Sequence, residues 1–471
     1  MLKFLPILLL ISALSCKSKT EDEQPIVPTP TLPVQVWTTS ADQVNLLYKK
    51  TIDFAAGKDD RFQTIQIDTT QQLQPIEGFG FTLTGGSAML LNQMGASERA
   101  TLLKAFFGKD SNSISVSYLR LSIGASDLDA EVFSYDDRPT GQTDPTLQYF
   151  NLSKDTLHLI PILKEILAIN PNITLMGSPW SPPVWMKTNG SSVGGNLRTE
   201  FYGAYAQYFV NYIQAYKSLG ITIDAITPQN EPQHGGNNPS MVMSAAQQAD
   251  FIKNHLGPAF QAAGITTKII VWDHNCDNPG YPIEILNDAA AKAFVFGSAF
   301  HLYAGDVGSL STVHDAHPDK ALYFTEQWTG KNGTFDGDLQ WHIKNVVIGT
   351  MRNWSRVALE WNLANDPNFG PHTPGGCTEC RGAVTIDGST ATKNVSYYII
   401  AQASKFVPPG SVRLGSNTPG QFHNVAFRTP SGKNVLIVLN ENASIQSFNI
   451  NAGSRWITAS LQGKTVGTFV W

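Results

Sequence analysis

The sequence ITPQNEP, residues 226–232, joins an apolar strand pattern to a polar end that carries Asn230 and Glu231. A second stretch, ALYFTEQW at residues 321–328, has the same pattern, with Glu326 at the end of its apolar run. A single glutamate after a strand is most often a solvated loop residue, but α/β barrels place catalytic side chains at the carboxyl ends of strands. Because the design occurs twice, we expect a site with paired carboxylates.

Strand and helix patterns alternate through the middle of the chain. Eight units over roughly 330 residues favour a closed (β/α)8 barrel over an open doubly wound sheet. The Gly-rich residues 76–90 lack the spacing of a nucleotide-binding loop. Strands are expected at 76–84, 116–123, 173–178, 223–229, 268–273, 297–303, 322–326 and 357–361. Helices are expected near 97–107, with Ser97 as N-cap, and near 153–170, 199–219, 244–264, 282–293, 309–317, 337–352 and 394–406.

The two ends of the chain differ from this middle part. Residues 407–471 contain five short alternating strands separated by turn residues, namely RLGSN, VAFRTP, NVLIVLNE, ASIQSFNI and GTFVW, and residues 37–75 are also strand-like. We expect both segments to form one antiparallel β-sandwich. The barrel, residues 76–406, would then be an insertion between its two parts.

The first residues have the features of a targeting segment. Lys3 precedes an apolar run at 4–14, which is too short to span a bilayer as a helix. The sequence Ala-Leu-Ser-Cys at 13–16 resembles a bacterial lipoprotein cleavage site, which makes residues 1–16 a signal peptide and Cys16 the acylated residue. Residues 17–36 are polar and Pro-rich and are expected to be a flexible tether. We therefore expect export and a lipid anchor as the only membrane attachment, at the cell surface or the periplasmic face of a bacterial membrane.

Composition limits the kinds of partner. The chain has 471 residues, enough for a large domain and a smaller one. Its net charge is −5 with only 15% charged residues, so no basic surface for nucleic acid is expected. The 10 Trp, 14 Tyr and 24 Phe beside 39 Gly suit an aromatic-lined cleft.

Two of the four cysteines are close in sequence, Cys377 and Cys380. A zinc site would need four ligands, and only His301 and His372 offer themselves as further ligands. In an oxidising compartment a local disulfide that holds a loop is favoured over free thiols. No role is assigned to Cys276.

Polar and aromatic side chains gather at the ends of the predicted strands. Glycoside cleavage needs one carboxylate as nucleophile and one carboxylic acid for the leaving oxygen, while flat aromatic rings stack on sugars and an Asn can bind a hydroxyl. Each Trp alone would more often belong to the core. The residues are Arg120, Asp127, Trp180, Trp185, Asn230, Glu231, His301, Tyr303, Glu326, Trp328, Trp361 and Asn362.

The chain resembles glycoside hydrolase family 30 from about Ile76 to Trp471. The motifs are IEGFGFTLTGGSA, SYLRLSIGASDLD, GSPWSPPVWMKTNG, QNEP, FTEQW, LEWNLA and SKFVPPGSVR. The resemblance implies a (β/α)8 barrel with a β-sandwich, retention of anomeric configuration, and no metal or cofactor. It makes Glu231 the acid/base and Glu326 the nucleophile. It also implies that glucose contacts Asp127, Trp180, Asn230 and Trp361, and that His301 and Tyr303 are an aromatic pair beside the nucleophile. From their places at strand ends, Trp328 is expected to bind substrate and Arg120 to support the site.

The resemblance leaves several substrates open. Residues 375–386, which include both neighbouring cysteines, resemble a loop of the family's β-1,6-glucanase branch, and a β-glucan polysaccharide or oligosaccharide is the expected partner. WNLA and SPWSPPVWMKTNG are shared with glucosylceramidases, and Arg381 raises the alternative of glucuronoxylan. A non-catalytic carbohydrate-binding lipoprotein would not need both glutamates. A metal-dependent hydrolase could use His301, Asp273 and His274, but HExxH spacing is absent.

One expectation concerns the two carboxylates themselves. A second negative charge beside ionised Glu326 is unfavourable, so we expect the pKa of Glu231 to be raised. Glu231 would then be protonated when substrate binds.

Overall fold

The computed structural model describes residues 1–2, 5 and 33–471. The predicted acylation site Cys16, nearly all of the signal peptide and residues 17–32 of the tether lie outside the described residues. Within the described parts of the chain, no helix has the length and apolar character needed to cross a membrane.

A closed parallel barrel forms the centre of residues 33–471, with strand order β10-β12-β4-β5-β6-β7-β8-β9. Each strand overlaps one predicted segment, so the (β/α)8 barrel is confirmed. Every residue of β4, β5 and β10 is buried, as expected for parallel strands covered on both faces. The strands are β4 (Gly78–Leu83), β5 (Tyr118–Ser122), β6 (Thr174–Ser178), β7 (Ala225–Ile226), β8 (Lys268–Cys276), β9 (Val295–Gly305), β10 (Ala321–Glu326) and β12 (Ser355–Asn362).

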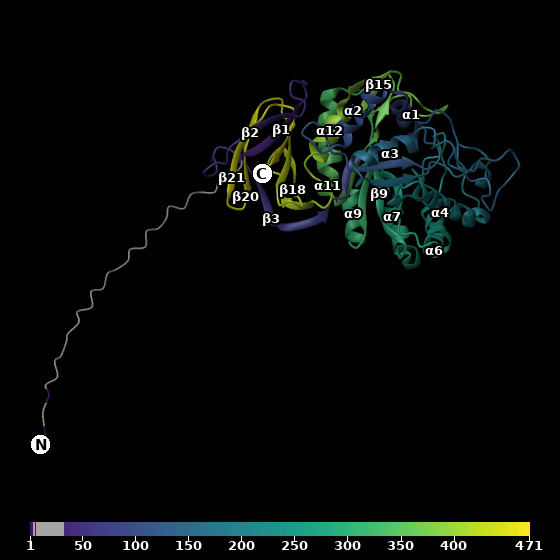
Figure 1. The fold of residues 1–471 in the computed structure, drawn as a ribbon, viewed down its shortest axis with the longest axis horizontal. Coiled ribbons are helices and arrows are strands. Elements are labelled where there is room, and N and C mark those ends of the chain that lie inside the picture. Colours follow the sequence, from purple (N-terminus) through teal and green to yellow (C-terminus); the bar gives the residue numbers. More distant parts are fainter. Residues whose placement is uncertain (3–4, 6–32) are drawn as a thin grey trace. The chain divides into compact units, whose positions relative to one another are not determined.

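Helices surround this barrel (Figure 1). They are α1 (Gly85–Gln93), α2 (Ala96–Phe107), α3 (Leu159–Ile169), α4 (Tyr202–Ser218), α5 (Ala245–Phe251), α6 (Gly257–Ala262), α7 (Gly280–Asn287), α8 (Ala289–Lys292), α9 (Ser309–Ala316), α10 (Phe335–His342), α11 (Thr350–Arg352) and α12 (Val395–Ser404). Short π-helical segments, Ile252–Leu256 and Ile343–Gly349, join α5 to α6 and α10 to α11. The predicted helices 244–264 and 337–352 are therefore each one continuous segment. Two 3₁₀ turns, Val184–Met186 and Thr199–Phe201, lie in the loop after β6 and before α4.

Helix α1 was not predicted, because two glycines at its start lower helix propensity and suggested only a turn. Thr84 caps the helix by accepting a hydrogen bond from the backbone N–H of Ser87. A glycine is needed because a Cβ on Gly86 would lie 2.4 Å from the carbonyl oxygen of Leu128. The Gly-rich segment thus packs a helix closely against the loop after β5.

The N-terminal and C-terminal strands form one nine-stranded sheet, as predicted for the second domain. Its order is β2 (Tyr48–Ile52), β1 (Val34–Ser40), β22 (Thr465–Val470), β19 (Asn434–Asn440), β18 (Phe422–Arg428), β17 (Val412–Ser416), β3 (Gln63–Pro75), β20 (Gln446–Ala452) and β21 (Arg455–Leu461). Phe448 on β20 packs against Phe422 on β18, with ring centroids 4.7 Å apart, and against Phe469 on β22 at 5.9 Å. The two halves of the sheet therefore face each other as a sandwich.

Four details differ from the sequence predictions. Strand β1 begins at Val34, inside the predicted tether 17–36. The pair β3–β20 is parallel, although an antiparallel sandwich was predicted, and β21 was missed. Helix α2 begins at Ala96 with Gly95 as N-cap, so Ser97 is not the cap.

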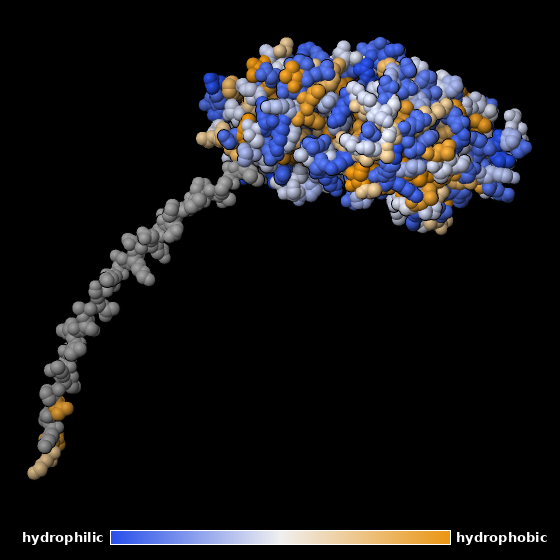
Figure 2. Space-filling view, turned by 45° about the horizontal axis from the view of Figure 1, so that its top comes forward, coloured by the Kyte–Doolittle hydropathy of each residue, from blue (hydrophilic) through white to orange (hydrophobic). Residues whose placement is uncertain are grey.

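The sandwich is joined to the barrel by a shared core. Val425 and Ile437 of the sandwich belong to the same buried cluster as Ile400 of α12. Thr468 Oγ1 donates a hydrogen bond of 2.6 Å to Gln402 Oε1, also on α12. Figure 1 shows the purple N-terminal strands beside the yellow C-terminal strands next to this helix, and Figure 2 shows one face on which hydrophobic residues form small patches among hydrophilic ones.

The loops at the carboxyl ends of β10 and β12 carry two small sheets. In one, β11 (Thr329–Gly330) pairs with β14 (Cys380–Arg381). In the other, β13 (Ala364–Asn365) pairs with β15 (Val384–Asp387), which pairs with β16 (Thr390–Lys393). These sheets fix long loops beside the strand ends that were predicted to carry the site.

Candidate active site

Glu326 ends β10 and is held by two donors. Arg120 Nη1, from β5, donates a hydrogen bond of 2.6 Å to Glu326 Oε2, and the Tyr303 hydroxyl, from β9, donates one of 2.9 Å to Oε1. Both carboxylate oxygens therefore have a partner that favours the ionised form. Glu326 is 6% exposed, so one narrow face remains open to a substrate.

Glu231 follows β7 in a backbone conformation that is rare for a residue with a side chain. Its φ is +45°, and its N–H donates to the carbonyl oxygen of Asp273 at 3.0 Å. Trp272 and Asp273 also have positive φ values, 74° and 60°. Unusual backbone angles cluster at functional sites when the surrounding structure holds them. They aim the Glu231 carboxylate at His301, where Oε1 lies 3.2 Å from Nδ1.

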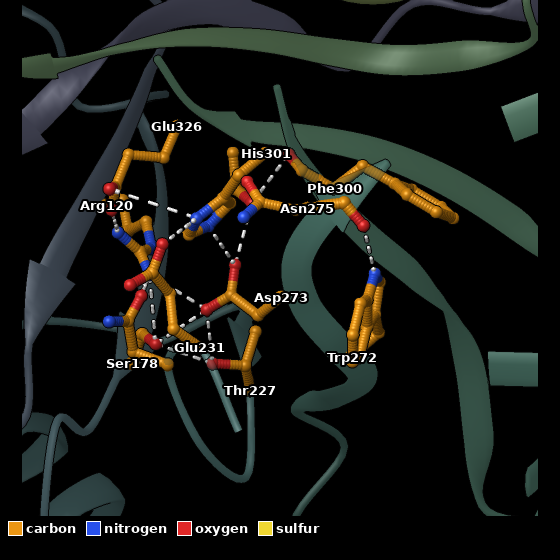
Figure 3. A network of polar contacts seen from close by, with 12 residues as sticks. Arg120, Ser178, Thr227, Glu231, Trp272, Asp273, Asn275, Phe300, His301 and Glu326 are labelled. Carbon is orange, nitrogen blue, oxygen red and sulfur yellow. Dashed lines mark hydrogen bonds and ion pairs between the residues drawn. The ribbon is translucent and has the colours of Figure 1, made fainter. Parts of the chain in front are cut away.

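His301 on β9 lies between the two predicted catalytic carboxylates (Figure 3). Its Nδ1 is 3.2 Å from Glu231 Oε1 and 3.8 Å from Glu326 Oε1. One oxygen of each carboxylate and this nitrogen all lie within 4.8 Å of one another. The two carboxylates are thus close neighbours.

Beneath these groups, the Asp273 carboxylate connects both halves of the site (Figure 3). Its Oδ1 lies 3.2 Å from His301 Nε2, and its Oδ2 accepts a hydrogen bond of 2.8 Å from Arg120 Nη2. Asp273, Arg120 and His301 are all fully buried. Three hydroxyls also donate to this carboxylate: Ser178 of β6 at 2.7 Å, Thr325 of β10 at 2.7 Å, and Thr227, directly after β7, at 2.8 Å.

The pKa of Glu231 is not raised, and this expectation from the sequence is wrong for the substrate-free site. Burial raises the pKa of Glu231, but the hydrogen bond and positive charge of His301 outweigh burial, so the pKa is lowered. The pKa of Glu326 is raised, because burial is opposed only in part by the charges of His301 and Arg120. An isolated pair of carboxylates would repel each other, but here a third titratable group, His301, contacts both.

His301 is the group that holds the proton in this arrangement. Burial lowers its pKa, but the charge of Glu326 and the hydrogen bonds to Asp273 and Glu231 raise the pKa to about 9. His301 is therefore protonated at neutral pH, and the site contains a buried cation beside each catalytic carboxylate.

A cavity of about 320 Å³ opens above these carboxylates. It is lined by both glutamates and by five of the seven predicted substrate-binding residues, Asp127, Trp180, Tyr303, Trp328 and Trp361. The other two, Asn230 and His301, are buried beside the lining residues, and Asn230 Oδ1 accepts a hydrogen bond of 2.6 Å from Arg120.

The aromatic wall of this cavity is packed on Arg120. The rings of Trp180 and Trp361 lie 5.4 Å apart at 32°, and the Arg120 guanidinium is 4.8 Å from the Trp180 ring. Two rim residues from the sequence list do not take part. Trp185 donates from Nε1 to the carbonyl oxygen of Asp136 at 2.9 Å and packs in the core, and Asn362 donates to its own loop at Ala364.

Sequence reasoning missed part of the site. Asp273 was considered only as a metal ligand, although it stands at the end of the predicted strand 268–273 and could have been found by the same rule as the other strand-end residues. His274 was likewise considered only as a metal ligand. Three further residues line the cavity, His234 and Asn237 from the loop after β7 and Asn275 from β8. No period or motif marks these three in the sequence.

The predicted disulfide between Cys377 and Cys380 is confirmed. Both cysteines line the cavity, and the backbone N–H of Cys377 donates a hydrogen bond of 3.2 Å to Asp127 Oδ2. Cys276 is a buried free cysteine.

Glu231, His301 and Glu326 are also close enough to share a metal ion. His301 could be a ligand only after losing its proton, and Arg120 already supplies a positive charge to Glu326 through a bond of 2.6 Å. The arrangement is therefore that of an ion-pair network in which the cations are side chains.

Comparisons with known proteins agree with this geometry. Residues 76–407 match the model of the glycosyl hydrolase family 30 TIM-barrel domain, and residues 410–469 match that of the family 30 β-sandwich domain. An endo-1,6-β-D-glucanase from Aspergillus fumigatus is 35% identical over 444 residues, 88% of each chain. A putative glucosylceramidase from Caenorhabditis elegans is 29% identical over 413 residues, 82% of this chain and 78% of that protein.

A solved structure has the same architecture. The endo-β1,6-glucanase BT3312 superimposes with a TM-score of 0.88 at 35% sequence identity, over 93% of this chain and 99% of that chain. The two family models cover the barrel and the sandwich, and the barrel contains the paired glutamates. The chain belongs to glycosyl hydrolase family 30 and is a glycoside hydrolase.

Proposed function

We propose that this enzyme cleaves β-1,6-glucan within the polysaccharide and retains the β configuration of the product. One observation carries the retaining mechanism: oxygens of Glu231 and Glu326 lie within 4.8 Å of each other. Retaining enzymes place their carboxyl groups about 5–5.5 Å apart, whereas inverting enzymes need about 6.5–9.5 Å to admit a water. The linkage is supported by similarity to two proteins described as endo-1,6-β-glucanases.

Glu326 is the proposed nucleophile. Arg120 and Tyr303 donate to its two oxygens, which orients the carboxylate and stabilises its charge. Attack on the anomeric carbon would form a glycosyl-enzyme as the glycosidic oxygen leaves with a proton. Water activated by Glu231 would then release the sugar with its original configuration.

Glu231 is the proposed acid and base, and His301 supplies its proton. In the free site His301 carries the proton, and its Nδ1 is 3.2 Å from Glu231 Oε1. Transfer along this hydrogen bond gives neutral His301 and a protonated Glu231 without changing the charge of the pair. A bound sugar would favour this step, because excluding water makes a separated ion pair less favourable.

The remaining cavity residues are proposed to bind the sugar. Trp180, Trp361 and Trp328 offer aromatic faces, and Asp127 offers carboxylate oxygens. Within residues 33–471, no residue accepts a hydrogen bond from Asn230 Nδ2, since the contact with Arg120 uses Oδ1. That amide can therefore donate to a substrate oxygen beside the reacting carbon.

A digestion series tests the substrate. Pustulan, laminarin, glucuronoxylan and an aryl β-glucoside would be incubated with the enzyme, and product sizes and early anomeric configuration would be followed by chromatography and proton NMR. We expect rapid shortening of pustulan to oligosaccharides, with β products first. Strong activity on glucuronoxylan with little on pustulan contradicts the proposal, and release of glucose alone would indicate action from chain ends.

Glucosylceramide is the second candidate substrate, because a relative described as a putative glucosylceramidase covers 82% of the chain. The glucuronoxylan alternative depended on Arg381. The Arg381 guanidinium instead donates a hydrogen bond of 2.8 Å to the carbonyl oxygen of Lys331 and does not line the cavity. We therefore favour a neutral glucan.

We also propose export and acylation at Cys16, on the sequence features of residues 1–16. An enzyme for an insoluble or cell-wall polysaccharide would then act outside the cytoplasm. Metabolic labelling with an alkyne fatty acid should mark the wild-type protein and not Cys16→Ala. Equal labelling of both proteins, or none of either, contradicts this assignment.

A further inference from the structure

The disulfide loop contributes more to the site than a wall of the cavity. Cys380 lies in β14, where it pairs with Gly330 of β11. Strand β11 follows Glu326 by two residues, so one cysteine is fixed beside the segment that carries the proposed nucleophile. Cys380 is 6% exposed and packs with Trp180 and Trp361.

Cys377 connects this anchored point to the sugar-binding carboxylate. Its N–H donates a hydrogen bond of 3.2 Å to Asp127 Oδ2. In the described part of the chain, no other residue donates a hydrogen bond to this carboxylate. The Cys377 amide is therefore the contact from another residue that orients the Asp127 carboxylate, beside the backbone amide of Asp127 itself.

The loop that carries Cys377 also packs against the backbone of Asp127. The N–H of Thr373 donates to the backbone carbonyl of Asp127 at 2.9 Å, and a Cβ on Gly376 would lie 2.3 Å from the same carbonyl oxygen. The loop thus passes against the Asp127 backbone at one end and is anchored at Cys380 at the other. The disulfide is the covalent link that sets where Cys377 lies between these points.

We propose that the Cys377–Cys380 disulfide is a positioning element for sugar recognition and that it makes hydrolysis sensitive to dithiol reductants. This inference rests on the proposed contact between Asp127 and the sugar. A dithiol would donate two electrons and two protons; the S–S bond breaks, two cysteine thiols form, and the dithiol closes to its own cyclic disulfide. The Cys377 amide would then no longer be held on Asp127.

The expected consequence is weaker sugar binding with a shifted pH dependence. Burial raises the pKa of Asp127 to about 7, with repulsion from Glu326 and Glu231, while the Cys377 amide lowers it. Asp129 and Tyr303 are further titratable neighbours of Asp127, and His234 and His274 line the same cavity. Loss of the amide raises the pKa of Asp127 further, so in the reduced enzyme Asp127 becomes neutral at a higher pH than in the oxidised enzyme. As the pH is lowered, KM should therefore rise earlier in the reduced enzyme.

The test compares oxidised and reduced enzyme on an aryl β-glucoside and on the preferred polysaccharide across pH. Dithiothreitol is the reductant, and alkylation with mass spectrometry confirms that both thiols are free. We expect KM to rise about tenfold, the loss of roughly one hydrogen bond to a charged group, with a smaller change in kcat. Removal of reductant and reoxidation should restore KM.

Variants separate this effect from general loss of structure. The double variant Cys377→Ser/Cys380→Ser should have the raised KM permanently and should not respond to dithiothreitol. Cys276→Ser should respond as the wild type does, because the buried free cysteine takes no part. A reduced enzyme with unchanged KM and pH profile, or one that loses only kcat and thermal stability, overturns the proposal.

Binding of a glucose-configured iminosugar, measured by calorimetry, gives the same readout without turnover. Weaker binding after reduction supports the inference even if the polysaccharide assignment fails, and equal binding overturns it. Failure of the proposed substrate would instead appear in the oxidised enzyme, as no cleavage of β-1,6-glucan.

Discussion

The two ends of the barrel both place a carboxylate between basic side chains, but in different surroundings. At the amino ends of the strands, Glu77 contacts Lys268 at 3.0 Å and Arg356 at 3.3 Å, and these side chains remain 18% to 31% exposed. At the carboxyl ends, Asp273 contacts Arg120 at 2.8 Å with both side chains fully buried. Solvent screens the charges of the first set, whereas the charges of the buried second set interact more strongly and shift the pKa values of Asp273 and His301.

The larger cavity is not at the end of the barrel that carries the catalytic glutamates. A cavity of about 800 Å³ at the amino end is lined by Glu77, Asp224 and Lys268, whereas the cavity above Glu231 and Glu326 has about 320 Å³. The smaller cavity contains the buried charges, the strained backbone and the aromatic rings. Chemistry in this fold therefore follows the burial of charge, in agreement with the use of the carboxyl face by barrel enzymes.

The largest expected effect comes from removing the nucleophile. Glu326→Ala should lower kcat/KM on every substrate by on the order of 10⁴-fold or more, because no other group can form the glycosyl-enzyme. With azide and an activated aryl β-glucoside, this variant should give an α-glycosyl azide. Recovery of a β-glycosyl azide would mean that the roles of the two glutamates are exchanged.

Removing the acid/base should have a smaller and substrate-dependent effect. Glu231→Ala should lose about 10²- to 10⁴-fold on polysaccharide, the usual contribution of general acid–base catalysis. An aryl β-glucoside with a good leaving group needs no proton, so the glycosyl-enzyme should still form and then accumulate. Added azide should release it as a β-glycosyl azide, and mass spectrometry should detect the trapped enzyme without azide.

Asp273→Asn tests the buried network directly. The change keeps the shape but removes the charge that both Arg120 and His301 contact, leaving buried cations without one of their partners. Loss of one member of a buried ion pair typically costs about 3–5 kcal/mol. Urea unfolding should show this loss of stability together with reduced kcat/KM, and wild-type values for both would show that Asp273 is not the connecting group.

The fold was predictable from the sequence because the barrel strands are largely apolar runs, most of whose residues are buried. The two glutamates were predictable because each stands near the carboxyl end of such a run. The position of His301 between them was not, since it depends on which strands are neighbours and on side-chain direction. The loop residues His234 and Asn237 have no periodic signal, and Asp273 was missed although it stands at a strand end. The pKa prediction for Glu231 was wrong for the same reason, because the side chain that lowers its pKa, His301, comes from another strand.

The pH dependence of activity should reveal the role of His301. The pKa of His301 is raised to about 9 from an ordinary value near 6.5. A raised pKa means that the interaction of the protonated form is fully present below about 6.5 and is lost as the pH rises through about 9. Activity should therefore fall on the basic side as the His301–Glu231 pair loses its proton, and on the acidic side as Glu326, whose pKa is raised, becomes protonated.

His301→Gln should move the basic limb of kcat/KM to lower pH. Glutamine can donate a hydrogen bond to Glu231 but cannot store a proton, so Glu231 would have to keep the proton alone. The shift should be clear on polysaccharide and weak on an activated aryl β-glucoside. A basic limb that stays at its wild-type pH on polysaccharide would mean that His301 does not hold the catalytic proton.

The smallest effect is expected at the other end of the barrel, with Glu77→Gln. This side chain also contacts Lys268, Arg356 and the Tyr323 hydroxyl, but its ion pairs are partly exposed. Pairs in contact with water contribute about 0–1 kcal/mol, and a glutamine can still accept a hydrogen bond from the tyrosine. We expect urea unfolding within about 1 kcal/mol of wild type and unchanged kcat/KM, in contrast to Asp273→Asn. If Glu77→Gln instead cost as much stability as Asp273→Asn, burial would not be the property that separates the two ends, and charge pairing alone would explain both.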